Sequence, residues 1–182
     1  MTAVSRTARP RFARRALQLL AIAPFLMVAS AAHAQSAITV KPLSDDECTA
    51  LAKELSNRSG VSVDMVVGSA DSYLFTNVGG TACLFSGTAT GISKNLENLS
   101  KIAGGFEGWT RDNAYDADGP DGTNAAFTRG QDWFAVSVSA EPPSGECEDV
   151  MISDCKAPKE KWTWTVSGIA FTAPASSVKP EF

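Results

Sequence analysis

The chain has 182 residues with 20 acidic and 16 basic side chains, and its formal net charge is −4. Because the phosphates of nucleic acids and anionic membranes attract basic surfaces, this balance argues against both as partners. The length suits a single domain with a substantial core.

The first segment of the chain predicts an export signal. Residues 1–15 contain five arginines and no acid, residues 16–31 form an apolar run, and small residues follow at Ala32-His33-Ala34. A basic flank, an apolar stretch and an A-x-A site are the three parts of a secretory signal. We expect cleavage after Ala34 rather than an uncleaved anchor, because a membrane span needs roughly 20 apolar residues. Arg14-Arg15 leaves the general secretory and the twin-arginine routes open.

Cleavage changes the chemistry that the chain can perform. The product has 148 residues, and its 11 basic and 20 acidic side chains give a net charge of −9. His33 is the only histidine and is removed with the signal, which excludes Ser-His-Asp and Cys-His catalysis and an imidazole-based zinc site. Carboxylate-pair, lysine-based and tyrosine-based chemistry stays open. We expect a periplasmic or secreted protein with no cofactor and no remaining membrane anchor.

The four cysteines predict two disulfides. All four follow the signal, and an even number in an exported chain indicates a disulfide framework. Cys147 and Cys155 are close in sequence, so we expect their bridge to close a loop. Cys48 and Cys83 would then join the first helix to a strand. No C-x-x-C motif is present, which disfavours a redox pair or a metal site.

Two helices and three strands are predicted before residue 109. Ser44 and Glu47 form a capping box that begins the first helix, which should end near Ser59-Gly60. The apolar positions of this helix are Cys48, Leu51, Ala52 and Leu55. Extended segments are predicted at 61–67, 73–76 and 82–89, with a turn at Gly79-Gly80. A second helix should begin near Ser93 and carry Leu96, Leu99, Ala103 and Phe106 on one face.

Extended structure dominates the prediction for the rest of the chain. Strands are expected at 109–115, 123–128, 132–139 and 162–167, with a loop at 116–122, a hairpin turn at Arg129-Gly130 and a stapled acidic loop at 141–159. The predicted organisation is a signal at 1–34, one domain at 35–173 and a mobile tail at 174–182. The expected fold class is α+β, in the order α-β-β-α-β-β-β: an antiparallel sheet of about five strands with two helices packed on one face.

Two clusters of acids are candidate binding sites. Asp116, Asp118 and Asp121 lie among glycines and could bind calcium through their oxygens, although a hairpin turn explains them better because Asp-Gly and Gly-Pro form turns. Glu146, Glu148 and Asp149, with Asp154 nearby, could form an acidic surface for a basic protein partner. The alternative for the second cluster is a solvated loop.

Trp162 and Trp164 alternate with polar residues and should lie on one strand face. Such a pair can bind sugar rings, but it more often fills a core. No G-x-G-x-x-G fingerprint for a phosphate is present.

Two segments resemble a family of small secreted bacterial proteins of unknown function. One runs from Gly108-Trp109-Thr110 to Thr123, and the other runs from Cys147 through Ile152-Ser153-Asp154-Cys155 to Trp162-Thr163-Trp164-Thr165. The resemblance implies a secreted, disulfide-linked module and brings no catalytic residue.

These observations together predict an exported, non-enzymatic binding, inhibitory or accessory protein of the bacterial envelope. A hydrolase that uses paired carboxylates is the first alternative, and such an enzyme needs two acids about 5–10 Å apart with one raised pKa. A protein that binds calcium or a small ligand is the second alternative.

Overall fold

The computed structural model describes residues 38–71, 74–75, 77–91, 104–119, 122–175 and 180. The chain divides into two compact units, Met1–Ala34 and Gln35–Phe182. All of the described residues belong to the second unit.

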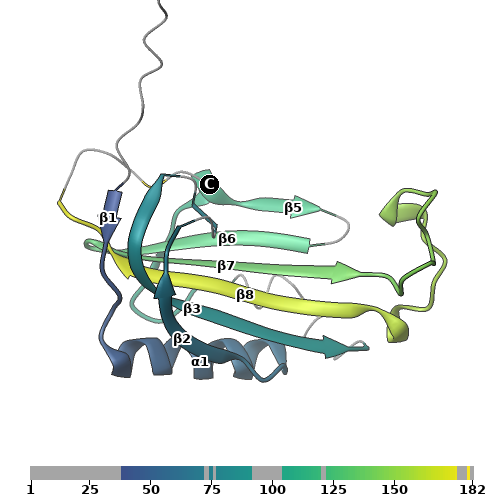
Figure 1. Ribbon diagram of the computed structural model, residues 1–182, viewed down its shortest axis with the longest axis horizontal. Coiled ribbons are helices and arrows are strands. Elements are labelled where there is room, and N and C mark those ends of the chain that lie inside the picture. Colours follow the sequence, from purple (N-terminus) through teal and green to yellow (C-terminus); the bar gives the residue numbers. More distant parts are fainter. Residues whose placement is uncertain are drawn as a thin grey trace, which may run out of the picture. The chain divides into compact units, whose positions relative to one another are not determined.

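Among the described residues, eight strands form a mixed sheet (Figure 1). The strands are β1 (Ile38–Val40), β2 (Asp64–Ser69), β3 (Val78–Thr90), β4 (Thr110–Arg111), β5 (Ala117–Gly119), β6 (Gly122–Arg129), β7 (Asp132–Glu141) and β8 (Thr163–Thr172). Their order is β1-β3-β8-β7-β6-β4, with β2 also beside β3 and β5 also beside β6. β1 runs parallel to β3, and all the other pairs are antiparallel.

One α-helix, α1 (Asp45–Ser59), is present among the described residues, and it forms as the sequence predicts. Ser44 and Glu47 complete the capping box, which satisfies backbone N–H groups that the first helical turn leaves without partners. Gly60 ends the helix in the left-handed conformation with φ 72°, which a glycine adopts without strain. Cys48, Leu51 and Leu55 are buried against the sheet.

The predicted fold class is wrong. The structure is mostly β, with eight strands in a mixed sheet and one described α-helix, instead of two helices on an antiparallel sheet of five strands. Residues 92–103 of the second predicted helix lie outside the described residues, as do most of the predicted tail and part of the 73–76 segment.

Several boundaries also differ from the prediction for identifiable reasons. Gly79-Gly80 lies inside β3 rather than in a turn, because β1 pairs with this stretch. The predicted strand at 109–115 stops after β4, where the Asp112 side chain accepts a hydrogen bond from the Ala114 N–H and begins a short 3₁₀ helix, η1 (Asn113–Tyr115). β5 occupies part of the predicted 116–122 loop and pairs with β6.

The helix side of the sheet holds the larger core. Alternate residues of β7, among them Phe134, Val136 and Val138, point to this side and are buried, as strand periodicity requires. Trp162 and Trp164 join the same cluster with 3% and 7% of their surface exposed, so the core interpretation of this pair is correct.

The opposite side of the sheet is divided into an apolar half and a polar half. A second cluster that includes Phe75, Trp133 and Phe171 covers the half near β1. In the other half, one row of paired residues across β3, β8, β7 and β6 consists of Ser86, Ser167, Ser137 and Asn124. The next row, across β3, β8 and β7, consists of Thr88, Thr165 and Ser139. We call these seven residues the hydroxyl face. All seven are exposed or half-buried.

Both predicted disulfides are present. Cys48 in α1 is bonded to Cys83 in β3, which ties the first helical turn to a central strand. Cys147 is bonded to Cys155 across eight positions of sequence. No cysteine is free. These bridges are compatible with a protein outside the cytoplasm, where disulfides persist.

Candidate functional site

The segment between β7 and β8 carries the second disulfide and extends beyond the ends of both strands (Figure 1). We call residues 144–156 the stapled loop. Hydrogen bonds between residues three positions apart fold it. The Val150 N–H donates to the Cys147 carbonyl at 3.5 Å, and the Asp154 N–H donates to the Met151 carbonyl at 2.8 Å. The second of these bonds belongs to a 3₁₀ turn, η2 (Ile152–Asp154). Local bonds and the disulfide therefore fold the backbone of this segment outside the sheet.

The base of the stapled loop is attached to the helix-side core. Ile152 and Cys155 pack against that core with part of their surface buried, as does Ala157 just after the loop. The Trp162 indole N–H donates to the Ala157 carbonyl at 3.1 Å, across the 3₁₀ turn η3 (Lys159–Lys161). These contacts fix the base, and the disulfide closes the part that projects.

The projecting part combines apolar and acidic side chains. Met151 and Val150 have 75% and 51% of their surface exposed, and both are large apolar residues that the fold leaves uncovered. The predicted acids Glu146, Glu148 and Asp149 are exposed beside them. Glu148 accepts a hydrogen bond from the Gly145 N–H at 3.1 Å, and Glu146 lies 3.9 Å from the exposed Lys161 ammonium group. The structure thus brings together the acids that the sequence singled out.

A hollow of about 430 Å³ lies within this loop. It is lined by Gly145, Cys147, Glu148, Asp149, Val150, Asp154 and Lys156. Cys147 has a positive φ of 66°, which is uncommon for a residue with a side chain. The disulfide holds this residue at the wall of the hollow, which is bordered by three acids, one lysine and the apolar side chain of Val150.

The other predicted acids have protein partners. Asp116 forms an ion pair with Arg111 at 3.0 Å, and Asp118 accepts a hydrogen bond from the Thr123 hydroxyl. Asp121 lies outside the described residues. Within the described part of the chain no three acids or cysteines are grouped in a way that could hold a metal ion. The calcium hypothesis therefore stays a prediction.

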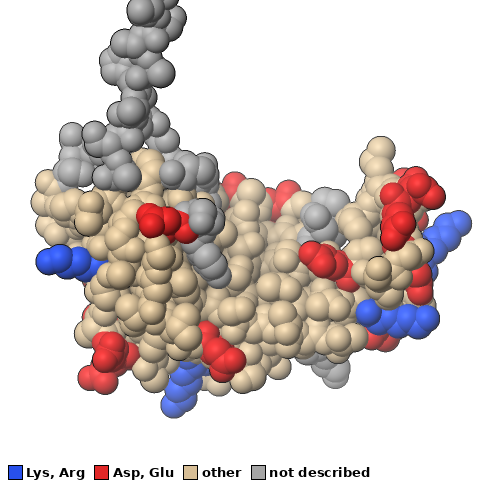
Figure 2. All heavy atoms as spheres, in the orientation of Figure 1, with Lys and Arg blue, Asp and Glu red and all other residues tan. Residues whose placement is uncertain are grey.

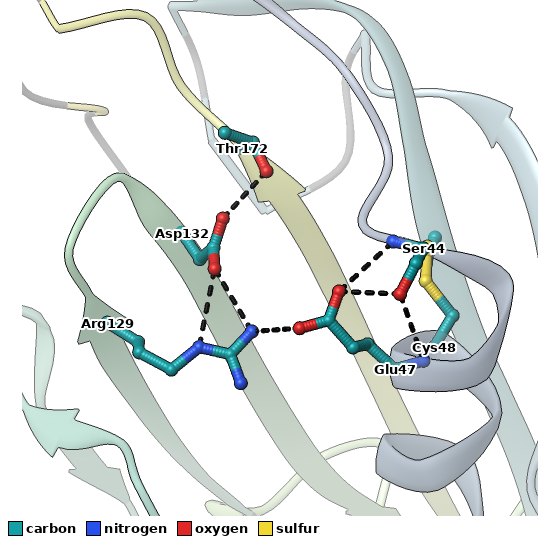
Figure 3. A network of polar contacts seen from close by, with 7 residues as sticks. Ser44, Glu47, Cys48, Arg129, Asp132 and Thr172 are labelled. Atoms are coloured by element: carbon teal, nitrogen blue, oxygen red, sulfur yellow. Dashed lines mark hydrogen bonds and ion pairs between the residues drawn. A yellow bond between two sulfur atoms is a disulfide. The ribbon is translucent and has the colours of Figure 1, made fainter.

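A polar network that sequence reasoning missed links α1 to the β6–β7 hairpin (Figure 3). The Arg129 guanidinium donates to Glu47 at 2.5 Å and to Asp132 at 3.0 Å. Thr172 donates to the other oxygen of Asp132 at 2.7 Å. Arg129 and Glu47 are 82 positions apart in sequence, so only the folded chain brings them together.

The same arginine borders a hollow of about 270 Å³ between α1 and the segment 106–109. The guanidinium carbon lies 4.6 Å from the centre of the Trp109 ring, and Glu47, Glu54 and Glu107 also line the hollow. The hydrogen bond from the Ser44 hydroxyl is the largest cause that lowers the pKa of Glu47, with Arg129 adding to it and partial burial opposing it. Partial burial alone would lower the pKa of Arg129, but its bonds to Asp132 and Glu47 raise it.

These shifts show what the network does chemically. A carboxyl group that acts as a general acid needs a raised pKa, and the pKa of Glu47 moves in the opposite direction. The network keeps Glu47 ionised and Arg129 protonated, which suits a structural connection between helix and hairpin.

The Glu47→Gln variant tests this connection through its pH dependence. Glutamine preserves the capping box, so the substitution removes only the charge. Because folding lowers the pKa of Glu47, the charged form stabilises the native state above the ordinary glutamate pKa, and this stabilisation disappears as the pH falls through the lowered value. We expect wild type to be more stable than the variant by up to about 1 kcal/mol at neutral pH, since both partners are partly exposed.

Urea denaturation of both proteins at neutral and acidic pH measures this difference. The two stabilities should converge as the pH falls. A difference that stays constant or grows on acidification would show that Ser44 and Arg129 together do not stabilise the charged carboxylate in the folded state.

A second uncovered surface is the hydroxyl face. Figure 2 shows few charged residues over the middle of the side that it presents, with both acidic and basic residues toward the margins. A hollow of about 330 Å³ lies at its β5 end, where Asn124, Ser137 and Ser139 form part of the lining. Serine, threonine and asparagine side chains can both donate and accept hydrogen bonds, so this face suits water or an uncharged polar surface.

Comparison with known proteins finds no matching family model, no matching curated protein and no matching solved structure. The class that the structure itself defines is a disulfide-linked β-sheet unit with a projecting stapled loop and, among the described residues, one α-helix. Among the described residues, no helix has both the length and the apolar character that crossing a membrane requires.

Proposed function

We propose that this protein is an exported, non-enzymatic binding module that recognises a basic protein partner through its stapled loop. The carrying observation is the exposure of Met151 and Val150, 75% and 51%, on a disulfide-closed loop beside Glu146, Glu148 and Asp149. Protein-binding surfaces commonly place a few apolar anchors at the centre and polar residues around them.

The charges and the apolar side chains have different tasks in this proposal. From Glu146 to Asp154 the loop has four acidic and no basic residues, so its local field attracts a positively charged surface. Acids of this kind raise the rate of association and make it sensitive to salt. Val150 and Met151 supply the apolar area that is removed from water on contact, which slows dissociation.

The stapled loop already has its backbone conformation in the free protein, which supports binding without refolding. The disulfide and the bonds from Val150 and Asp154 fix the backbone before any partner arrives. A preorganised loop loses little conformational entropy on binding, so more of the contact energy appears as affinity.

The proposal is tested by affinity capture followed by substitutions in the loop. The exported protein, cross-linked in the periplasm and in the medium, should retain a specific basic partner. The double variant Val150→Ser/Met151→Ser should weaken binding of that partner about tenfold or more, as loss of apolar anchors does. Neutralising Glu146, Glu148 and Asp149 together should slow association and remove most of its dependence on salt.

A matched variant controls for the total charge. Asp64→Asn/Glu107→Gln/Glu160→Gln removes three exposed acids outside the stapled loop, and it should bind like wild type. Unchanged binding by both loop variants would refute the proposed role of the loop. Turnover in a substrate screen, with no captured partner, would favour the hydrolase alternative instead.

A further inference from the structure

β2 is an edge strand with an unpaired side. Among the described residues it pairs with β3 and with no other strand. The Ala70 N–H donates to the Gly80 carbonyl at 3.0 Å, which continues the β2–β3 register by one pair. Residues of an antiparallel pair alternate between bonding across the pair and pointing away from it. Val66 and Gly68 therefore direct their backbone groups toward β3, whereas Met65, Val67 and Ser69 direct theirs outward.

The exposed side of β2 is also apolar and unprotected. Val66 and Val67 have 60% and 50% of their surface exposed, on opposite faces of the strand. Natural edge strands usually avoid further pairing through lysine, proline or a bulge. The segment Asp64–Ser69 has no lysine or proline, and its six residues pair with β3 without interruption.

We propose that β2 pairs with β2 of a second copy of this protein, antiparallel and with Val67 on the two-fold axis. In this register Val67 and the partner's Val67 exchange two backbone hydrogen bonds. Met65 and the partner's Ser69 exchange two more, as do Ser69 and the partner's Met65. Every outward N–H and carbonyl group of these three residues then has a partner, and the two sheets become continuous.

The sequence of β2 is complementary to itself in this arrangement. The only charged residue of the strand is Asp64, which falls opposite the partner's Ala70, so no like charges face each other. Val66 lies beside the partner's Gly68, which leaves room for its branched side chain. A second copy therefore covers both exposed valines and satisfies the strand edge at once, as an isologous two-fold interface requires.

Cysteine substitutions at the two valines test both the pairing and its register. Residues of a hydrogen-bonded antiparallel pair have Cα atoms about 5.5 Å apart, which is within the range that a disulfide spans. The exported Val67→Cys protein should form a covalent dimer under oxidising conditions, visible on a non-reducing gel. Val66→Cys is at least as exposed but does not face itself across the axis, so it should remain mostly uncross-linked.

Sedimentation measures the interface without a new cysteine. Wild-type protein should sediment as a dimer that dissociates on dilution, and Val67→Lys should be monomeric with an unchanged circular dichroism spectrum, since the side chain is half exposed. Val150→Lys, equally exposed but on the stapled loop, should remain dimeric. A monomeric wild type, a dimeric Val67→Lys, or cross-linking of Val66→Cys in place of Val67→Cys would each overturn the proposal.

Discussion

Replacing Cys48 and Cys83 together by alanine is expected to lower the free energy of unfolding by about 4 kcal/mol, because the bridge closes a long loop in the unfolded chain. The two cysteines are separated by 35 positions, and the entropy of the unfolded chain rises when such a loop is opened. For a domain of this size the loss should appear as a fall in Tm of roughly 8–16 °C.

The second disulfide is the matched comparison for this prediction. Its cysteines are only eight positions apart, so replacing Cys147 and Cys155 should cost about 2.5 kcal/mol by the same argument. Guanidinium denaturation of both double variants gives the two values directly. A larger loss for the stapled loop than for Cys48–Cys83 would contradict the loop-length explanation.

Replacing Phe134 by alanine is expected to destabilise the protein by about 3–5 kcal/mol, the usual cost of a large cavity in a core. This ring is fully buried in β7 and contacts four other aromatic rings. Ring centroids lie 4.8 Å away for Phe106, 5.7 Å for Phe127, 5.8 Å for Trp109 and 5.9 Å for Phe85. Removing it therefore loses apolar burial and several edge-to-face or stacked contacts together.

Phe134→Leu separates these contributions, because leucine refills much of the volume without an aromatic ring. We expect it to cost distinctly less than Phe134→Ala, and thermal unfolding of the two variants measures both. Equal losses for leucine and alanine would show that ring contacts outweigh the cavity. A loss below about 1 kcal/mol for alanine would show that the surrounding rings collapse into the space.

The parts of the fold that depend on neighbouring residues could be predicted from the sequence. Ser44 and Glu47 define the start of α1 because a capping box is a local pattern. The turn at Arg129-Gly130 and the alternation after Trp162 likewise located the β6–β7 hairpin and β8. Both disulfides followed from spacing and from the even number of cysteines.

The remaining parts depend on partners that are distant in sequence. β1 has only three residues and exists because it pairs with β3 around Gly79, about 40 positions later. β4 has two residues and is defined by its pairing with β6. No local pattern distinguishes such short edge strands from loops, which is why the sheet was predicted with too few strands and the wrong fold class.

The candidate site was predictable in its charge but not in its apolar part. Glu146, Glu148 and Asp149 stand out by composition alone. The exposure of Val150 and Met151 depends on which apolar residues of the segment reach the core, and Ile152 takes that position. Because Val150, Met151 and Ile152 are all apolar and adjacent, only the folded structure shows which of them packs against the core.

The hydroxyl face limits where a second layer of secondary structure could stack on this side of the sheet. Two sheets stack when both present continuous apolar faces, as in a β-sandwich. Here the apolar cluster around Phe171 and Trp133 stops at the row that contains Ser137 and Ser167, where alternate positions become polar. A second layer that extended over this row would have to remove hydroxyl groups from water without offering them partners. Among the described residues, the serines and threonines therefore mark a boundary beyond which this face of the sheet stays in contact with solvent.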